Sequence, residues 1–446
     1  DSPIIATTAV QFLNTLFAAS TSCIRRMQAL GDSVIILDEI QALPIKVFKL
    51  FNTAMNYLAY FCQSSVILCS ATQPLLDKLD RYCILPPVKM LEDESKYDDA
   101  FRRVQIKDYT NEGGMSYAEA ADFISEQAEK ARSVLAIVNT KKCAQEVFKH
   151  LKSKVDPSCL LFHLSTNMCA AHRKTVLDKI RAELSDRNNK GKIICVSTTL
   201  IEAGVDVSFE RVVRSLTGLD SIVQAAGRCN RNRETDCGIV SIINIREESI
   251  SSLENISKAQ EATRDLLYSI KANSDNYPGG ILAKSAMDEY YARYFRPLQK
   301  QMEYPLKDNP ERTIIDLLTD DPARRKRFEA QGGNSKTVLL KQAFREAGHE
   351  FFVIDDSSKN DVIIDYDDEA NKLLSELKTA KTIHEKKAAL LSLQRYTVQL
   401  RINDLKKLDA ALQPFETGLY ILDRIFYDKN LGVNDTGELP VELFII

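Results

Sequence analysis

The chain has 446 residues, of which 44% are hydrophobic, so it can build roughly two to four domains with substantial cores. Its 59 basic and 62 acidic residues give a net charge of -3, which excludes a bulk electrostatic attraction for nucleic acid and requires any such contact to be local. No apolar run reaches the roughly 18 residues of a membrane span. The ten cysteines include no C-x-x-C pair, so we expect reduced thiols in a cytoplasmic protein without membrane contact.

Short apolar runs alternate with amphipathic stretches up to about residue 245, which is typical of parallel α/β layers. A polar passage near residue 100 separates two α/β lobes, and long charged helices follow at about 250–273, 284–301 and 367–411. We predict a first lobe over 1–100, a second lobe over 101–247, a helical linker over 248–330 and a mainly helical C-terminal accessory domain over 331–446. The expected strands are 33–37, 65–69, 133–138, 159–162, 192–196 and 239–244.

An acidic pair, Asp38 and Glu39, follows the first expected strand directly. The carboxyl ends of strands are where ligands bind in open α/β sheets. There one acid can hold Mg²⁺ on the phosphates of a nucleotide while its neighbour polarises the attacking water. An acidic loop after a core strand is the simpler interpretation of the pair taken alone.

Hydroxyl side chains follow several other expected strands. Ser70-Ala71-Thr72 can hydrogen-bond the acidic pair and relay the nucleotide state to a nucleic-acid channel. Thr7, Thr8 and Gln11 near the start, and Asn139-Thr140 after strand 133–138, are candidate contacts to nucleic-acid phosphates. Helix caps account for these last two groups equally well.

The segment after strand 192–196 combines hydroxyls, a glycine and an acid. Thr198 can meet a nucleic-acid phosphate, and Gly204 allows close approach of the backbone. Asp206 can orient a ribose hydroxyl or an arginine. A helix N-cap is the alternative role for Thr198 or Thr199.

Gln224-Ala225-Ala226-Gly227-Arg228-Cys229-Asn230-Arg231 is the most informative segment. On a helix, Gln224, Arg228 and Arg231 fall at i, i+4 and i+7, so one face carries an amide and two guanidinium groups. Such a face can clamp a γ-phosphate, and its arginines can stabilise the transferring phosphoryl group. A solvated basic face is the alternative.

Aromatic and basic residues mix in the stretch 288–296, which includes Tyr290, Tyr291 and Tyr294. This mixture can stack nucleobases, although a packed amphipathic helix accounts for it more simply.

Taken in chain order, the motifs closely resemble the helicase portion of the CRISPR-associated helicase-nuclease of type I interference systems, a superfamily 2 helicase. The motifs are T-T-A-V-Q-F (7–12), L-D-E-I-Q (37–41), S-A-T (70–72), V-S-T-T-L-I-E-A-G-V-D-V (196–207) and Q-A-A-G-R-C-N-R-N (224–232). Gln41, Thr199 and Ala225 depart from the residues that many relatives carry, and none of these changes removes the core chemistry.

The resemblance implies an α/β fold with a partial and a complete RecA-like lobe. ATP and Mg²⁺ would bind in the cleft, with Asp38 and Glu39 as metal-linked acids. Single-stranded DNA, displaced by an RNA-guided type I surveillance complex, would be the track. Gln41, Gly204, Asp206, Arg228 and Arg231 would complete the nucleotide site.

The family architecture also includes an HD nuclease with divalent metals and a phosphate-binding loop. The chain contains no His-Asp dipeptide and no G-x-x-x-x-G-K-[ST]. We therefore expect a companion segment that carries both, as a separate chain, as a cleaved piece that stays bound or as another portion of the same protein. We also expect negligible ATPase activity for this chain alone. A non-catalytic DNA- or complex-binding module and an RNA-remodelling helicase are the alternative functions.

Overall fold

The computed structural model describes residues 3–90, 103–186, 191–202, 204–251, 253–319, 322–334, 342–354, 359–408, 411–416 and 418–434. The chain forms two compact units, each built from two separate stretches of sequence. The first unit comprises residues 1–96 and 268–355, and the second comprises residues 97–267 and 356–446. The three boundaries between the four predicted domains stay predictions, and the one near residue 100 lies outside the described residues.

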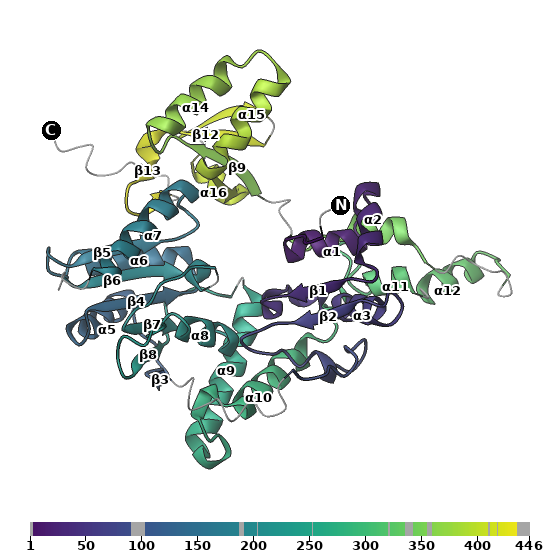
Figure 1. The fold of residues 1–446 in the computed structure, drawn as a ribbon, viewed down its shortest axis with the longest axis horizontal. Helices are drawn as coiled ribbons and strands as arrows, with labels where there is room; N and C mark the ends of the chain where they lie inside the picture. Colours follow the sequence, from purple (N-terminus) through teal and green to yellow (C-terminus); the bar gives the residue numbers. More distant parts are fainter. Residues whose placement is uncertain are drawn as a thin grey trace. The chain divides into compact units, whose positions relative to one another are not determined.

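The first unit contains a two-stranded parallel sheet of β1 (Val34–Leu37) and β2 (Ser65–Leu68), close to two expected strands (Figure 1). Its first sequence stretch adds α1 (Ala9–Phe17), α2 (Thr21–Met27) and α3 (Phe48–Tyr60). The second stretch supplies α10 (Lys284–Phe295), α11 (Ile314–Leu318), α12 (Pro322–Ala330) and α13 (Phe344–Glu350). Helix α9 (Glu254–Ala272) is the covalent connection that enters this stretch from the second unit.

Buried contacts join the two stretches of the first unit. The fully buried Lys49 on α3 places its Nζ 2.9 Å from Glu303 Oε1 and 2.9 Å from Asp80 Oδ1. The rings of Phe48 and Phe295 meet edge to face with centroids 5.5 Å apart. Residues 268–355, which the sequence pattern assigns to a linker and an accessory domain, therefore complete the core of the first lobe.

The second unit is built around a six-stranded sheet in the order β3-β8-β7-β4-β6-β5, in which every pair is parallel. Four of these strands match expected ones, and β3 and β7 are additions to the predicted set. The strands are β3 (Val104–Asp108), β4 (Ser133–Val138), β5 (Leu160–Leu164), β6 (Ile193–Thr198), β7 (Arg211–Ser215) and β8 (Gly238–Ile243).

Helices cover both faces of this sheet because successive strand residues point to opposite sides. On β4, Val134 packs into the core that contains α5 (Tyr117–Glu129) and α6 (Lys141–Lys152). Its neighbour Leu135 packs into the opposite core with residues of α7 (Ala170–Ser185) and α8 (Leu219–Ala226). All six strands run parallel, so their carboxyl ends lie along one edge of the sheet.

The C-terminal part of the second unit contains a four-stranded mixed sheet in the order β10-β9-β12-β11. The prediction of a single helix over 367–411 is wrong. A capping box of Thr382 and Glu385 begins a second helix, and a strand follows that helix. The elements are β9 (Lys359–Ile364), α14 (Asp368–Thr379), α15 (Ile383–Leu393), β10 (Thr397–Arg401), α16 (Ile402–Lys407), β11 (Leu412–Glu416) and β12 (Leu419–Leu422).

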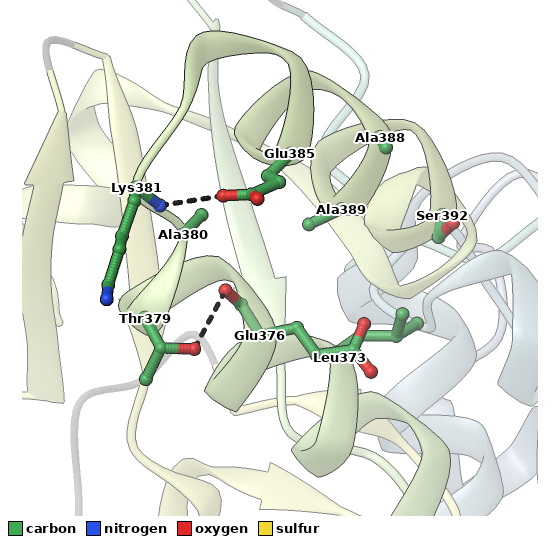
Figure 2. A pocket seen from close by; sticks show the side chains of 9 residues that line it. All are labelled: Leu373, Glu376, Thr379, Ala380, Lys381, Glu385, Ala388, Ala389 and Ser392. Carbon is green, nitrogen blue, oxygen red and sulfur yellow. Dashed lines mark hydrogen bonds between the residues drawn. The ribbon is translucent and has the colours of Figure 1, made fainter.

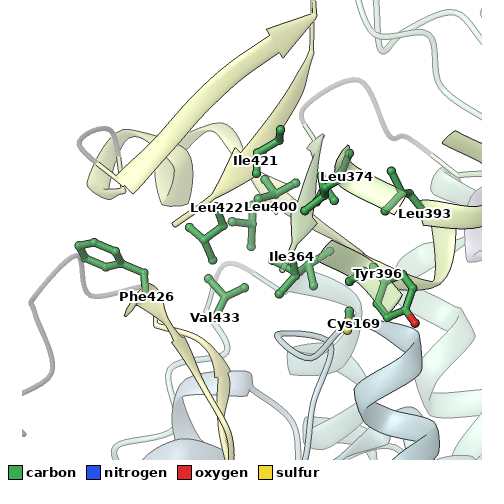
Figure 3. Close-up of a cluster of buried hydrophobic side chains, with 14 of the residues drawn as sticks. Cys169, Ile364, Leu374, Leu393, Tyr396, Leu400, Ile421, Leu422, Phe426 and Val433 are labelled. Atoms are coloured by element: carbon green, nitrogen blue, oxygen red, sulfur yellow. The ribbon is translucent and has the colours of Figure 1, made fainter. Parts of the chain in front are cut away.

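A short hairpin of β13 (Tyr427–Asp428) and β14 (Gly432–Val433) attaches this part to the six-stranded lobe. Val433 N donates to Asn167 O at 2.8 Å, and Gly432 has a left-handed φ of 82°. A Cβ at Gly432 would lie 2.4 Å from the same carbonyl oxygen, so only glycine fits there. Figure 3 shows Cys169 of the lobe beside Ile364 and Tyr396 in the shared apolar core.

A groove of about 530 Å³ lies between α14 and α15, and Figure 2 shows the side chains that line it. The carboxylate of Glu385 accepts a hydrogen bond from Lys381 N at 2.8 Å at its rim, which is part of the capping of α15. The groove therefore reflects how two helices meet. No helix among the described residues is long and apolar enough to cross a membrane.

Candidate active site

The acidic pair lies at the carboxyl end of β1, as predicted, and both side chains are exposed. Asp38 Oδ1 accepts a hydrogen bond from Glu39 N at 2.9 Å, and Glu39 has a left-handed φ of 53°. This strained backbone turns the Glu39 carboxylate towards Gln41, whose Nε2 donates to Glu39 Oε2. One oxygen of each carboxylate is engaged in this way, which leaves the other to accept a further ligand.

The hydroxyls of 70–72 lie beside the acidic pair because β2 is the parallel neighbour of β1. Ser70 Oγ is within donor range of both Gln41 Oε1 and the Thr72 carbonyl oxygen. Thr72 is buried, and its Oγ1 lies 3.0 Å from Tyr291 Oη on α10. Ala71 is exposed, Ser70 is half-buried and Thr72 is buried, and both hydroxyls contact protein groups.

The other hydroxyl candidates act as helix caps. Thr8 Oγ1 accepts from Gln11 N at 3.2 Å at the start of α1, and Thr140 Oγ1 accepts from Cys143 N at 3.2 Å at the start of α6. Thr7 and Gln11 are exposed beside the first cap. The cap interpretation is therefore confirmed for Thr8 and Thr140, and contact with nucleic acid stays a prediction.

In the second lobe, the segment after β6 places its acid against an arginine. Asp206 Oδ1 lies 3.1 Å from Arg231 Nε, and the two side chains are 82% and 41% exposed. Gly204 has a left-handed φ of 71° with open space around its Cβ position, whereas Thr198 is buried. Asp206 therefore faces an arginine in an exposed ion pair, and its role at the nucleotide stays a prediction.

The predicted helical face of Gln224, Arg228 and Arg231 is wrong, because α8 ends at Ala226 and the chain turns at Gly227. Arg228 is buried, and its Nε donates to Ile201 O at 3.1 Å while its Nη2 donates to Glu202 O at 2.5 Å. Arg228 therefore fixes the segment after β6 against α8. A phosphate-clamping role stays a prediction, and the exposed Arg231 is the better placed of the two arginines.

A buried ion pair supports this edge and has no counterpart among the predicted residues. Arg214 on β7 is fully buried, and its Nε lies 2.8 Å from Glu202 Oε1. Arg214 Nη1 also donates to Asn139 Oδ1 at 2.9 Å, and Arg214 Nη2 donates to Ser221 Oγ at 2.9 Å. Burial raises the pKa of Glu202, and the adjacent Arg214 opposes that shift.

Glu248 continues this buried network after β8. Its Oε1 accepts from Asn139 N at 2.6 Å and from Thr140 N at 3.0 Å. Its Oε2 accepts from Ser215 Oγ at 2.5 Å. Residues after β4, β6, β7 and β8 are thus joined by one set of hydrogen bonds. In the sequence, the one indication of this network is an arginine, Arg214, within the apolar strand R-V-V-R-S (211–215).

The donor set fits a nucleotide-bound Mg²⁺ at the end of β1. Two exposed carboxylates on adjacent residues are the oxygen ligands that Mg²⁺ takes when phosphates complete its shell. Among the residues that the structure describes, no group of three or more His, Cys, Asp or Glu is placed to hold a metal ion alone.

The second unit thus has a parallel α/β lobe, and the first unit has an acidic pair linked to hydroxyls at the edge of a parallel sheet. Comparison with known proteins finds similarity to helicases over part of the chain. Residues 130–234 match the family model described as CRISPR-associated nuclease/helicase Cas3, C-terminal.

Individual relatives show the same similarity. A CRISPR-associated nuclease/helicase Cas3 of Haloferax volcanii is 28% identical over 313 residues, covering 52% of this chain and 33% of that protein. The crystal structure of T. fusca Cas3-ATP has a TM-score of 0.60 at 14% identity, covering 93% of this chain and 54% of the other. A chain of a CRISPR RNA-guided surveillance complex, pre-nicking, has a TM-score of 0.56 at 14% identity, covering 92% and 56%.

These likenesses confirm the resemblance predicted from the motifs: the chain is related to the C-terminal helicase portion of Cas3 proteins. The structural likeness over most of the chain confirms the predicted α/β fold class. The chain spans about a third of the length of the Haloferax relative and about half of the length of the solved structures.

Proposed function

We propose that the chain is the helicase portion of an ATP-driven translocase on single-stranded DNA that acts with an HD nuclease in CRISPR interference. The observation that carries this proposal is the contiguous set of hydrogen bonds from Glu39 through Gln41 to Ser70 at the edge of the first sheet. An acid that can polarise water is thereby tied to a hydroxyl segment that can respond to its state. The likeness to Cas3 helicases supports the same activity.

Within this function, each exposed group has a role set by its position. Asp38 and Glu39 would hold the Mg²⁺ that neutralises charge on the ATP phosphates, and Glu39 would orient the attacking water. Arg231, held by Asp206 at 3.1 Å, would supply positive charge from the second lobe. Arg228 and Arg214 would keep that edge in place from the interior.

A companion segment is a second part of the proposal. Parallel strands are normally covered on both faces, yet Val34 and Ile36 on β1 are 68% and 65% exposed. An apolar strand face of this kind needs a covering layer. A segment that carries the phosphate-binding loop would supply that layer together with the groups that cradle the triphosphate.

Association with a surveillance complex rests on the structural likeness to a chain of such an assembly. In that setting the complex would deliver displaced single-stranded DNA to the motor, and the HD nuclease of the companion segment would cut it.

Mass spectrometry of the purified protein under native and denaturing conditions, paired with an ATPase assay, tests this proposal. We expect a co-purifying or added polypeptide with a phosphate-binding loop to give ATPase activity that single-stranded DNA stimulates. In that assembly Glu39→Gln should reduce hydrolysis by about a hundredfold or more. Asp77→Asn, an exposed carboxylate away from the sheet edge, is the matched control.

Three outcomes would count against parts of the proposal. Glu39-dependent hydrolysis by this chain alone at a helicase rate would remove the need for a companion segment. A requirement for the 2′-hydroxyl of the strand would favour an RNA-remodelling helicase. DNA binding without hydrolysis in the complete assembly would favour a non-catalytic binding module.

A further inference from the structure

The Tyr291 hydroxyl lies where the hydroxyl segment 70–72 meets α10. Tyr291 is 2% exposed and Thr72 is 4% exposed, so water does not compete for their contact. Tyr291 Oη lies 3.0 Å from Thr72 Oγ1 and 3.4 Å from Thr72 O. Tyr291 lies outside the motifs quoted above, and its hydroxyl contacts Thr72, the last residue of the S-A-T motif.

The Tyr291 ring is held independently of its hydroxyl. It lies 5.2 Å from the ring of Phe295, which in turn packs against Phe48 at the start of α3. It also lies 5.1 Å from the ring of Tyr290. Removing the oxygen alone would thus leave the aromatic packing of α10 in place.

The hydroxyl of Ser70 can donate its hydrogen bond to either of two acceptors. A serine hydroxyl has one hydrogen to donate, and Ser70 Oγ faces two acceptors, Gln41 Oε1 and Thr72 O. Thr72 N donates back to Ser70 Oγ at 3.2 Å. If Glu39 turns to another ligand, Gln41 is released and the Ser70 proton can move fully to the Thr72 carbonyl.

Helix α10 can pass a displacement onward. Arg293, two residues after Tyr291, donates from Nη2 to Ser269 Oγ at 2.9 Å. Ser269 belongs to α9, the helix through which the chain leaves the second unit. A change at Thr72 thus has a bonded route to the connection between the units.

We propose that Tyr291 is a positioning residue that couples the state of the acidic pair to α10, through Thr72, Ser70 and Gln41. This inference rests on the proposed function, because the state that is relayed is that of ATP hydrolysis. Tyr291 touches neither nucleotide nor DNA in this role. Its hydroxyl converts a change in hydrogen bonding at the sheet edge into movement of a helix.

The test uses the assembly of this chain with its companion segment and compares Tyr291→Phe with Tyr290→Phe. Tyr290 is fully buried in the same helix and also loses a hydroxyl, so it matches the change in burial and chemistry. For Tyr291→Phe we expect the distance advanced per ATP to fall at least about fivefold while the KM for ATP stays within about twofold. Tyr290→Phe should leave the advance per ATP at the wild-type value.

A double-substitution cycle identifies the partner. Thr72→Val removes the other hydroxyl, and Tyr291→Phe combined with Thr72→Val should lose no more coupling than either change alone. Hydrogen exchange of this chain alone should show faster exchange in peptides containing residues 70–72 for Tyr291→Phe and not for Tyr290→Phe.

The outcomes separate the two levels of inference. A wild-type assembly without DNA-stimulated hydrolysis overturns the proposed function, and the relay with it. An active wild type in which Tyr291→Phe keeps normal coupling overturns the relay alone. Equal losses of coupling in Tyr291→Phe and Tyr290→Phe also overturn it, because they would indicate general loosening of α10.

Discussion

Among the residues that the structure describes, each unit fully buries one cationic side chain, and the two cations differ in their partners. Lys49 in the first unit pairs with Asp80 and Glu303, whose side chains are 56% and 24% exposed. Arg214 in the second unit pairs with Glu202, which is 5% exposed. The carboxylates around Lys49 reach water without it, whereas Glu202 depends on Arg214 for compensation of its charge.

This difference extends to the carboxyl-end edges of the two-stranded sheet in the first unit and the six-stranded sheet in the second. The edge in the second lobe is preorganised by a buried network that joins the ends of four strands. The edge in the first unit carries exposed acids on a sheet with an uncovered apolar face. We therefore expect the second edge to be rigid and the first to take its final form with its companion segment.

Arg214→Met should have the largest effect, because it leaves the buried Glu202 carboxylate without a cation, with the Ser221 hydroxyl donating to Oε2 at 2.7 Å. We expect a loss of about 3 to 5 kcal/mol in the opening free energy of the second unit. Hydrogen exchange of peptides from the six-stranded sheet, followed by mass spectrometry, measures this opening free energy. Adding Glu202→Leu should restore most of the loss, and a single-variant loss below about 1 kcal/mol would contradict the stated dependence.

Acid should also destabilise the second unit selectively. Burial lowers the pKa of His163 to about 3 and that of His172 to about 4, both below the unfolded value of 6.5. The unfolded state then binds more protons, so the stability present above pH 6.5 is lost as the pH falls towards 4. We expect a loss of about 2 to 4 kcal/mol between pH 6.5 and 4.5.

Exchange rates corrected for pH, compared between peptides of the two units, measure this loss. The first unit contains a single histidine, the exposed His349, and serves as the internal reference. His172→Phe should keep the ring against Tyr366, 4.8 Å away, and remove part of the acid sensitivity. An acid response of equal size in both units would contradict the prediction.

Tyr427→Phe should have a moderate effect that is confined to the attachment of the C-terminal part. Tyr427 Oη lies 2.8 Å from His172 Nδ1 and accepts from Cys169 N at 3.1 Å. Without the hydroxyl these groups lose a buried partner, so we expect a cost of about 1 to 2 kcal/mol. Hydrogen exchange of peptides containing residues 427–433 measures it, with Tyr420→Phe as the control.

Lys49→Met should have the smallest effect, about 1 kcal/mol or less in the first unit. Its two carboxylates regain water, and the methionine fills the space left by the lysine stem. Hydrogen exchange of peptides from α3 gives the measurement. A loss as large as that of Arg214→Met would break the comparison between the two buried cations.

The sequence allowed prediction of those features that depend on local order along the chain. The apolar run 133–138 is predicted as a strand from its sequence. The acidic pair and the hydroxyls of 70–72 each follow a strand directly, so parallel pairing of the two strands places both groups at the same edge of the sheet. The capping box from Thr382 to Glu385 was also readable, and it would have divided the helix expected over 367–411.

The remaining features depend on contacts between distant residues. Glu202 lies in an ordinary loop sequence after β6, and only the fold brings it to Arg214 on β7, with β4 between the two strands in the sheet. The end of α8 at Ala226 is set by the pairing of residues 209 and 229–230 rather than by helix propensity. Likewise, nothing in the composition of 268–355 indicates that it packs on the first lobe.

The discontinuous first unit has a consequence for synthesis on the ribosome. Its stabilising contacts join residues 254 positions apart, at Lys49 and Glu303, and 219 positions apart, at Thr72 and Tyr291. During synthesis, residues 3–90 therefore lack their packing partners in 268–355 until the whole six-stranded lobe has emerged, and their apolar surfaces stay uncovered for that time. The second lobe can fold in the meantime, so nascent chains should need chaperone protection early and lose that need only after residue 355 leaves the exit tunnel.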